Sequence, residues 1–317
     1  MRFPLATDMR AVGVTETGGP EVLHVVDLPV PEPGPGEVRI RTAAATVNPT
    51  DTIIRTRGAG SDELPPPWVP GMEVAGVVDA AGEGSAWSVG RRVMAIVSPR
   101  RPGGGAQAEL VVVPDDSVAA TPDTVTDAEA ATLPMNGLTV RLALDRLALA
   151  PGSVLGVTGA AGAVGGYAIQ LGKVAGLRVV ADAKPGDEEL VRGLGADVVV
   201  PRGDDVAAAF RSAVPEGVDG MVDAAVLDAA ALGAVRDGGG LATVRGWSGP
   251  SERGISVEPV MVVDYLHEGG KLAELVDLVT AGQLTLRVAG ELPAEQASEA
   301  HRRLEAGGVR GRLVLTF

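Results

Sequence analysis

The chain lacks several features that would tie it to a particular compartment or chemistry. It has no cysteine among its 317 residues, so disulfides and thiolate metal ligands are both excluded. Aromatic residues make up 3% against 45% hydrophobic residues, which indicates an aliphatic core. No apolar run approaches the roughly 20 residues of a membrane span, and residues 1–8 lack the apolar core of a signal peptide. The net charge of -14 argues against nucleic acid as a partner. We therefore expect a cytoplasmic protein with no membrane or nucleic-acid partner.

Short segments with strand character fill the first third of the chain. They are Met9–Val14, Leu23–Leu28, Glu37–Ala45, Glu73–Ala80, Arg92–Val97 and Ala108–Val113. Clusters of proline and glycine, such as residues 31–36, separate them. Strands this short and evenly spaced predict a compact β-barrel or sandwich.

From Thr126 the pattern changes to alternating strands and helices. Asp127 is expected to cap a helix over 128–133, and another helix is predicted over 138–148. The predicted strands are Val154–Thr158, Leu177–Ala181, Asp197–Val200, Gly220–Ala224 and Leu241–Val244. Helices predicted over 167–175, 188–194, 206–213 and 229–235 separate them. This alternation predicts a doubly wound parallel sheet.

The two patterns predict two domains, one over residues 1–125 and one over 126–264. Helices over 270–281 and 295–306 follow, and the chain ends in a predicted strand over 312–317. We expect residues 265–317 to rejoin the first domain, which would put the active cleft between the two domains.

A glycine-rich turn follows the strand Val154–Thr158 and is the strongest functional signal in the chain. Its spacing is Ala160-x-Gly162-x-x-Gly165, with a helix directly behind it. Glycine lets the backbone approach phosphates, and the N–H groups at a helix start favour an anion. Strand, turn and helix together predict a pyrophosphate site for a dinucleotide. The alternative is a tight turn without a ligand. The residues expected to contact the cofactor here are Ala160, Gly162, Ala163 and Val164.

Five further motifs resemble a known family when taken together. They are Val47-Asn48-Pro49-Thr50-Asp51, Pro70-Gly71-Met72-Glu73-Val74-Ala75-Gly76, Leu133-Pro134-Met135-Asn136-Gly137-Leu138-Thr139, Gly193-Leu194-Gly195-Ala196-Asp197 and Gly308-Val309-Arg310-Gly311-Arg312-Leu313-Val314-Leu315. With the glycine turn they cover nearly the whole chain, in the order found in the zinc-independent quinone oxidoreductases of the medium-chain dehydrogenase/reductase superfamily. The resemblance implies an α/β protein with a GroES-like β-barrel domain and a Rossmann domain. It also implies a homodimer joined through the sheets of the cofactor domains.

Metal ligands are scarce in this sequence. Where zinc-dependent members of the superfamily have cysteine, this chain has Val47-Asn48, and where they have histidine it has Met72, followed by Glu73. The three histidines lie far apart, at His24, His267 and His301. We therefore expect no zinc, and we interpret Glu73 as a charge paired inside the cleft.

Without a metal, the substrate must accept hydride readily, as quinones and activated enones do. The resemblance makes Asn48 the candidate donor to the oxygen that gains charge, and the alternative is a turn residue before Pro49. Asp51 is a candidate for orienting Asn48 or a water, although we favour an N-cap for a helix over 52–57. Relatives often carry tyrosine where Ile53 stands, so proton delivery is expected to fall to solvent.

The resemblance also assigns contacts with the nicotinamide. Thr139 matches a position that contacts the ring in relatives, and Asn136 lies one helical turn before it. Val226, just past a predicted strand, is expected to offer backbone groups to the carboxamide. The alternative for Asn136 and Thr139 is a buried pair at a helix N-terminus.

The end of the second strand of the parallel sheet decides between NADPH and NADH, because an acid there binds the adenosine ribose. Asp182 has the spacing of that acid, but a local count against zinc-dependent relatives places Ala183 there instead. Lys184, Arg202 and Arg310 are then available to a 2′-phosphate. We therefore predict NADPH, with NADH as the alternative.

These observations predict a zinc-free reductase that passes hydride from NADPH to a small quinone or α,β-unsaturated carbonyl. A biosynthetic enoyl reductase is the alternative within enzymes. A catalytically idle dinucleotide sensor is the alternative outside them, and Ile53 in place of tyrosine favours it.

Overall fold

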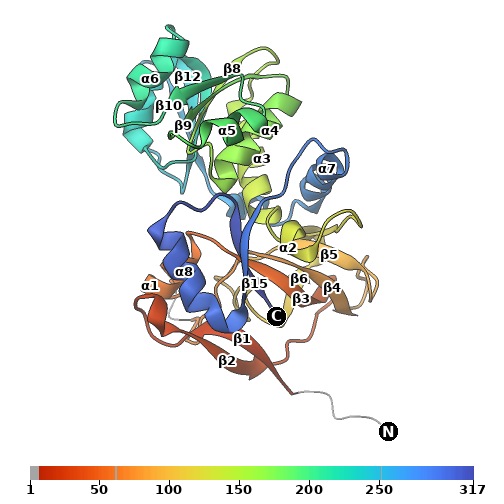
Figure 1. The fold of residues 1–317 in the computed structure, drawn as a ribbon. Helices are drawn as coiled ribbons and strands as arrows, with labels where there is room; N and C mark the ends of the chain where they lie inside the picture. Colours follow the sequence, from red (N-terminus) through yellow and green to blue (C-terminus); the bar gives the residue numbers. More distant parts are fainter. Residues whose placement is uncertain (1–6, 61–62, 251) are drawn as a thin grey trace. The chain divides into compact units, whose positions relative to one another are not determined.

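The computed structural model describes residues 7–317 except 61–62 and 251. The chain divides into two compact units (Figure 1). The first contains Met1–Met135, Leu266–Thr280 and Leu286–Phe317. The second contains Asn136–Tyr265 and Ala281–Thr285. The C-terminal segment thus returns to the first unit, and residues 126–135 belong to it as well.

A seven-stranded sheet forms the centre of the first unit, in the order β14-β15-β3-β4-β5-β7, with β6 paired to β3. Its strands are β3 (Glu37–Val47), β4 (Glu73–Ala81), β5 (Arg92–Ile96), β6 (Leu110–Pro114), β7 (Val118–Ala120), β14 (Val288–Pro293) and β15 (Arg312–Thr316). A separate hairpin joins β1 (Asp8–Val14) to β2 (Leu23–Pro29). The C-terminal β15 pairs antiparallel with β3, so segments from both ends of the chain share one sheet.

Helices of the first unit are short apart from the two near the C-terminus. They are α1 (Asp51–Arg57), α2 (Asp127–Ala130), α7 (Gly269–Thr280) and α8 (Ala297–Ala306), with 3-10 turns η1 (Pro20–Val22), η2 (Asp115–Ser117) and η5 (Ala294–Gln296). Thr126, rather than the predicted Asp127, caps α2. Its hydroxyl accepts the Glu129 N–H at 3.2 Å, and the Glu129 carboxylate accepts the Thr126 N–H at 2.8 Å. This reciprocal capping box satisfies two N–H groups at once, which Asp127 alone does not do.

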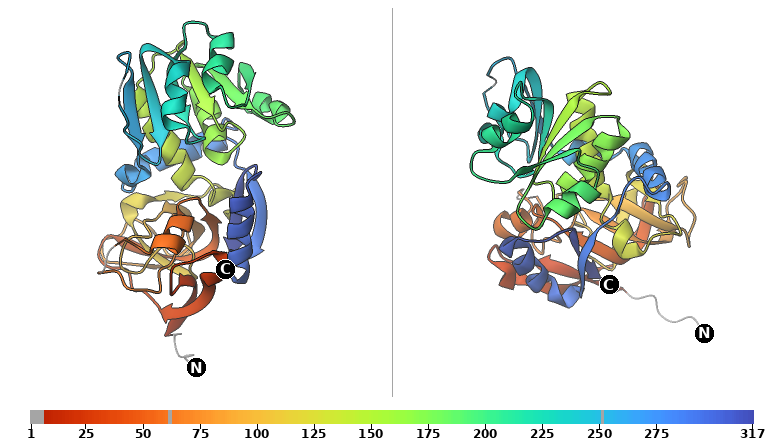
Figure 2. Two further views of the ribbon diagram at one scale, coloured as in Figure 1. Left: turned by 90° about the vertical axis from the view of Figure 1, so that its left-hand side faces the viewer. Right: turned by 45° about the horizontal axis from the view of Figure 1, so that its top comes forward.

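The second unit is a parallel sheet of six strands in the order β10-β9-β8-β11-β12-β13. The strands are β8 (Val154–Thr158), β9 (Arg178–Ala183), β10 (Val198–Pro201), β11 (Val218–Asp223), β12 (Val235–Val244) and β13 (Ser256–Val260). Its helices are α3 (Pro134–Leu147), which begins two residues before the unit, α4 (Ala163–Val174), α5 (Glu188–Gly193) and α6 (Val206–Ala213), with 3-10 turns η3 (Asp228–Ala234) and η4 (Val262–Tyr265). Figure 2 shows the strands of this unit side by side with helices packed along them. The strand order reverses beside β8, which is where doubly wound sheets bind ligands.

Several predicted elements differ from the observed ones. Helix α3 begins at Pro134 rather than 138, because proline suits the first helical position. The segment predicted as a helix over 229–235 is the 3-10 turn η3, and strands β7, β13 and β14 were not predicted. Strands β13 and β14 carry proline, which weakens a strand signal in the sequence, and β7 has only three residues.

Aliphatic side chains fill the core of each unit, as the composition indicates. In the first unit Val38, Ile40 and Val93 are fully buried between the strands. In the second, Val180, Met221 and Leu241 are fully buried, in one cluster with the aromatic Phe210. Burying one such side chain contributes roughly 1.5–3 kcal/mol. Within the described residues no helix is both long and apolar enough to cross a membrane.

Helix α8 carries a buried histidine. His301 is 0% exposed, and its Nδ1 lies 3.3 Å from a guanidinium nitrogen of Arg55 on α1. Arg55 also pairs with Glu305 at 2.5 Å. Burial, aided by the charge of Arg55, lowers the pKa of His301 to about 4. The imidazole is therefore neutral at pH 7 and accepts a hydrogen bond from Arg55.

This histidine is expected to make the first unit sensitive to acid. The unfolded chain binds a proton at His301 below about pH 6.5, whereas the folded protein does not until about pH 4. The contribution of His301 is thus complete above pH 6.5, and about 3 kcal/mol is lost as the pH falls to 4. Urea unfolding at pH 4 and 7.5 measures this effect. The difference in the free energy of unfolding between the two pH values is expected to be about 3 kcal/mol smaller in His301→Gln than in the wild type. The exposed His267→Gln serves as the control, and equal pH dependence in both variants would contradict the assignment.

Candidate functional site

The glycine turn joins β8 to α4 at the reversal point of the parallel sheet. Gly162 is the N-cap of α4, with φ -73° and ψ 177°, and it makes no side-chain cap. The N–H groups in the first turn of a helix have no carbonyl partner within the helix. Ala163 and Val164 supply two of these N–H groups and are partly exposed, whereas Ala160 is buried. A helix start of this kind is where anions are commonly bound in proteins.

The glycines of the turn have distinct physical roles. A Cβ on Gly165 would lie 2.4 Å from the Gly159 carbonyl oxygen, so Gly165 permits close packing of helix against turn. Gly159 has φ +61° and approaches the backbone of Ala224. A Cβ on Gly162 would meet a single atom, the Gly159 oxygen at 3.1 Å. Gly162 would thus accept a side chain after a small shift of that oxygen, whereas Gly165 would not.

Asp182, Ala183 and Arg202 lie close together at the end of β9. Asp182 is 3% exposed and accepts the Ala160 N–H at 3.1 Å, and burial raises the pKa of its carboxyl. Ala183, also 3% exposed, is the last residue of β9, and its carbonyl accepts the Arg202 N–H at 2.8 Å. Lys184 is exposed in the turn that follows. The structure therefore brings Asp182, Ala183 and Arg202 together, with Asp182 against the glycine turn.

The loop after β11 holds a valine in a left-handed conformation. Val226 has φ 57° and is 38% exposed. The buried Asp223 carboxylate accepts the N–H groups of Leu227 and Asp228, both at 2.7 Å, and the Thr158 hydroxyl at 2.6 Å. Strain of this kind in a β-branched residue costs of order 1–3 kcal/mol and is often found at functional sites. Asp223 and Thr158 thus fix a loop that presents the Val226 backbone.

The remaining predicted cofactor residues belong to other elements. Asn136 and Thr139 lie in the first part of α3, where they are 1% and 6% exposed. Arg310 is exposed in the turn before β15, in the first unit.

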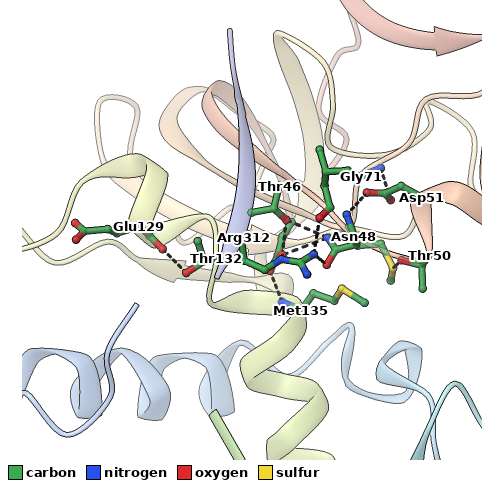
Figure 3. A network of polar contacts seen from close by, with 12 residues as sticks. Thr46, Asn48, Thr50, Asp51, Gly71, Glu129, Thr132, Met135 and Arg312 are labelled. Atoms are coloured by element: carbon green, nitrogen blue, oxygen red, sulfur yellow. Dashed lines mark hydrogen bonds and ion pairs between the residues drawn. The ribbon is translucent and has the colours of Figure 1, made fainter. Parts of the chain in front are cut away.

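In the first unit a buried polar network surrounds Asn48 (Figure 3). The Asn48 side chain is 0% exposed and donates to the Thr46 hydroxyl at 3.0 Å and to Glu73 at 3.3 Å. Its oxygen accepts a hydrogen bond from Arg312, which also donates to the Val47 carbonyl at 2.8 Å. The amide of Asn48 is therefore engaged on both its oxygen and its nitrogen.

Glu73 is the charged centre of this network and is 0% exposed. It accepts the Met135 N–H at 2.8 Å and the Thr46 hydroxyl, and the Arg312 Nε lies 4.0 Å from its Oε1. Burial raises the pKa of Glu73, and Arg312 opposes that shift. The predicted pairing of Glu73 is thus found within the first unit. The partner Arg312 was missed, because 239 positions of sequence separate the two residues (312 minus 73) and no local pattern links them.

Asp51 is not the N-cap that we favoured. The N-cap of α1 is Thr50, and Asp51 is the first helical residue. Its carboxylate accepts the N–H of Asn48 at 2.7 Å and that of Gly71 at 3.0 Å, while the Gln107 amide donates to it at 3.3 Å. Burial raises the pKa of Asp51 to about 7, although the two backbone N–H donors favour the charged carboxylate and lower it. Asp51 thus orients the Asn48 backbone and joins three segments of the chain.

The two positions compared above with the zinc ligands of the superfamily, Asn48 and Met72, carry neither thiolate nor imidazole. The positions at issue offer the amide of Asn48 and the thioether of Met72, which accepts a hydrogen bond from Thr50 at 3.3 Å. Zinc sites in proteins use thiolate, imidazole and carboxylate. Among residues 7–317 without 61–62 and 251, no three His, Cys, Asp or Glu side chains form a metal-binding group.

Two family models match the chain. An alcohol dehydrogenase GroES-like domain covers residues 34–123, and a zinc-binding dehydrogenase family covers 194–315. A chloroplast envelope quinone oxidoreductase homolog of Arabidopsis thaliana is 36% identical over 66% of this chain and 65% of its own length. The chain thus spans slightly less than two thirds of that relative. The NADPH-dependent alkenal/one oxidoreductase of the same plant is 29% identical over 97% of this chain and 79% of its own.

Solved structures match over the full length. A crystal structure of an NAD-dependent alcohol dehydrogenase superposes with a TM-score of 0.87 at 33% identity, covering 98% of this chain and 100% of its own. A mycobacterial protein solved with NADPH gives a TM-score of 0.84 at 31% identity, with the same coverage. These matches confirm the predicted pairing of a GroES-like domain with a Rossmann-like parallel sheet.

Proposed function

Because the chain belongs to the medium-chain dehydrogenase/reductase superfamily, we propose that it is an NADPH-dependent reductase of quinones or α,β-unsaturated carbonyls. The observation that carries this proposal is the glycine turn between β8 and α4. It lies where the strand order reverses, and a Cβ added at Gly162 would meet only the Gly159 oxygen. That combination suits the pyrophosphate of a dinucleotide.

The bound cofactor would supply a hydride, and the residues of this chain would hold it. The N–H groups of Ala163 and Val164 would bind the pyrophosphate. The strained loop at Val226 would offer backbone groups to the carboxamide, and Asn136 and Thr139 on α3 would contact the nicotinamide.

NADPH is the proposed cofactor because cations stand near the end of β9. Arg202 and Lys184 are the basic residues there. Ala183 has no carboxylate that could bind the adenosine ribose. The mycobacterial structure with NADPH supports this choice, whereas the NAD-dependent structural relative favours NADH as the alternative. Arg310 remains a candidate third cation.

We also propose that the reaction proceeds without a metal. The donor set around Asn48 and Met72 supports this, because neither side chain is a zinc ligand of the kind that structural or catalytic sites use. Asn48 would steady the oxygen that gains charge by exchanging its 3.3 Å bond to Glu73 for one to the substrate. Asp51, which accepts the Asn48 N–H, would hold the Asn48 backbone in position. Solvent would supply the proton.

Turnover assays on the purified protein test this function. Oxidation of NADPH and NADH is followed by the loss of nicotinamide absorbance against naphthoquinones, 2-enones and an enoyl thioester. We expect turnover of at least one acceptor class. The alkenal/one oxidoreductase relative supports an enone, and the quinone oxidoreductase homolog supports a quinone. Cofactor binding without turnover of any acceptor would favour the idle sensor instead, and a preference for enoyl thioesters would favour the enoyl reductase.

A homodimer is the proposed assembly. Strand β13 lies at one edge of the parallel sheet, and Met261 and Val263 directly after it are each 44% exposed. An edge strand with apolar neighbours is a surface that proteins commonly cover by pairing with another chain. Light scattering after size exclusion is expected to give twice the chain mass of 32.0 kDa, and a monomer at micromolar concentration would contradict the proposal.

A further inference from the structure

One carboxylate at the end of β9 has no part in the function proposed above. Asp182 is 3% exposed, although it stands next to a surface turn. Its Oδ1 accepts the Ala160 N–H at 3.1 Å, and it also accepts a hydrogen bond from the Gly159 backbone. Asp182 is therefore bound to the glycine turn and is not a loose surface acid.

The second oxygen of Asp182 faces Arg202. The Arg202 Nε lies 3.8 Å from Asp182 Oδ2, and the Arg202 N–H is fixed to the Ala183 carbonyl at 2.8 Å. The Arg202 side chain is 39% exposed. The guanidinium is thus partly exposed to solvent and lies beside a buried carboxylate.

This arrangement affects any phosphate that binds to Arg202. The buried carboxylate offsets part of the positive charge of the guanidinium at short range, where solvent screens poorly. The same carboxylate repels a phosphate dianion directly. A ligand without that phosphate lacks both interactions at Arg202, and the pyrophosphate beside the glycine turn is common to the two nucleotides.

We infer that Asp182 is a positioning residue that anchors the glycine turn and restrains Arg202, and that it thereby limits the preference for a dinucleotide carrying a 2′-phosphate. The inference rests on the proposed dinucleotide function and deepens it. Its consequence is that NADPH and NADH both bind, with a smaller difference than Arg202 alone would produce.

Equilibrium titration of NADPH and NADH separates the two effects of Asp182. In Asp182→Asn the amide oxygen still accepts the Ala160 N–H, but the charge on Arg202 is no longer offset. We expect NADPH to bind roughly three- to tenfold more tightly and NADH to change less than about twofold. Adding Arg202→Gln is expected to remove the gain. Thermal melting of each variant, without ligand, reports whether the turn is intact.

Asp204→Asn is the matched control, because it makes the same charge change at an exposed position on the loop that carries Arg202. Its ratio of NADPH to NADH affinity is expected to stay at the wild-type value. An unchanged ratio in Asp182→Asn overturns the inference, as does an equal gain in Asp204→Asn or a gain that survives Arg202→Gln. Equal weakening of both nucleotides together with a lower melting temperature also overturns it, because Asp182 would then act only on the fold. If the wild type binds neither nucleotide, the proposed function fails as well.

Discussion

Replacement of Gly162 by valine is expected to abolish dinucleotide binding and to leave the protein folded. A Cβ at this position would meet only the Gly159 oxygen, at 3.1 Å, so the unliganded chain accommodates a side chain with a small shift. The valine methyl groups would occupy the space beside the first N–H groups of α4. A pyrophosphate would lose its contact with those N–H groups, and affinity is expected to fall by about a hundredfold or more.

Titration of NADPH and NADH against Gly162→Val measures this effect, and thermal melting reports the fold. Gly193→Val is the matched control, because a Cβ at Gly193 has no heavy atom within 4 Å. Gly165→Val is expected to behave differently from both. Its Cβ would lie 2.4 Å from a backbone oxygen, so the melting temperature itself should fall. Normal binding by Gly162→Val would refute the placement of the pyrophosphate.

Removal of the Arg312 guanidinium is expected to be the most destabilising single change in the first unit. Arg312→Met leaves the buried Glu73 without its cation and leaves the Asn48 and Val47 oxygens without their donor. Breaking one partner of a buried pair costs about 4 kcal/mol. The folded-state pKa of Glu73 should rise further above its ordinary value of 4.5, so the variant should lose stability as the pH rises from 4.5 toward that pKa.

Urea unfolding at several pH values measures both expectations. Glu73→Gln in the Arg312→Met background is expected to restore much of the loss and to remove the pH dependence that Glu73 adds, because the buried Glu73 carboxylate that Arg312 had paired is then gone. Arg41→Met on the neighbouring β3 is the control. Arg41 is 64% exposed, and its partner Asp79 keeps Arg39 at 2.8 Å, so the cost should stay below about 1 kcal/mol. A loss in Arg312→Met no larger than in Arg41→Met would contradict the assigned role of the pair.

Local patterns predicted the parallel sheet well and its boundaries less well. The strand Val154–Thr158 and the helix over 206–213 have the predicted bounds. Strand β13 contains Pro259, which weakens the strand signal of its own residues. It forms a strand by pairing with its neighbour β12, and that pairing is not visible in the local sequence. The cap of α2 was assigned to Asp127 because both Thr126 and Asp127 are good caps, and the position of Glu129 decides between them.

The sequence by itself determined the strand, glycine turn and helix start of the second unit, because these are specified by neighbouring residues and backbone geometry. The absence of cysteine likewise determined that thiolate ligands are excluded. Only the tertiary structure decided what surrounds Asn48. Thr46, Glu73 and Arg312 meet there because β15 pairs with β3 and β3 pairs with β4. Strand pairing across more than 200 residues depends on the whole sheet, and no local spacing encodes which buried charges it will bring together.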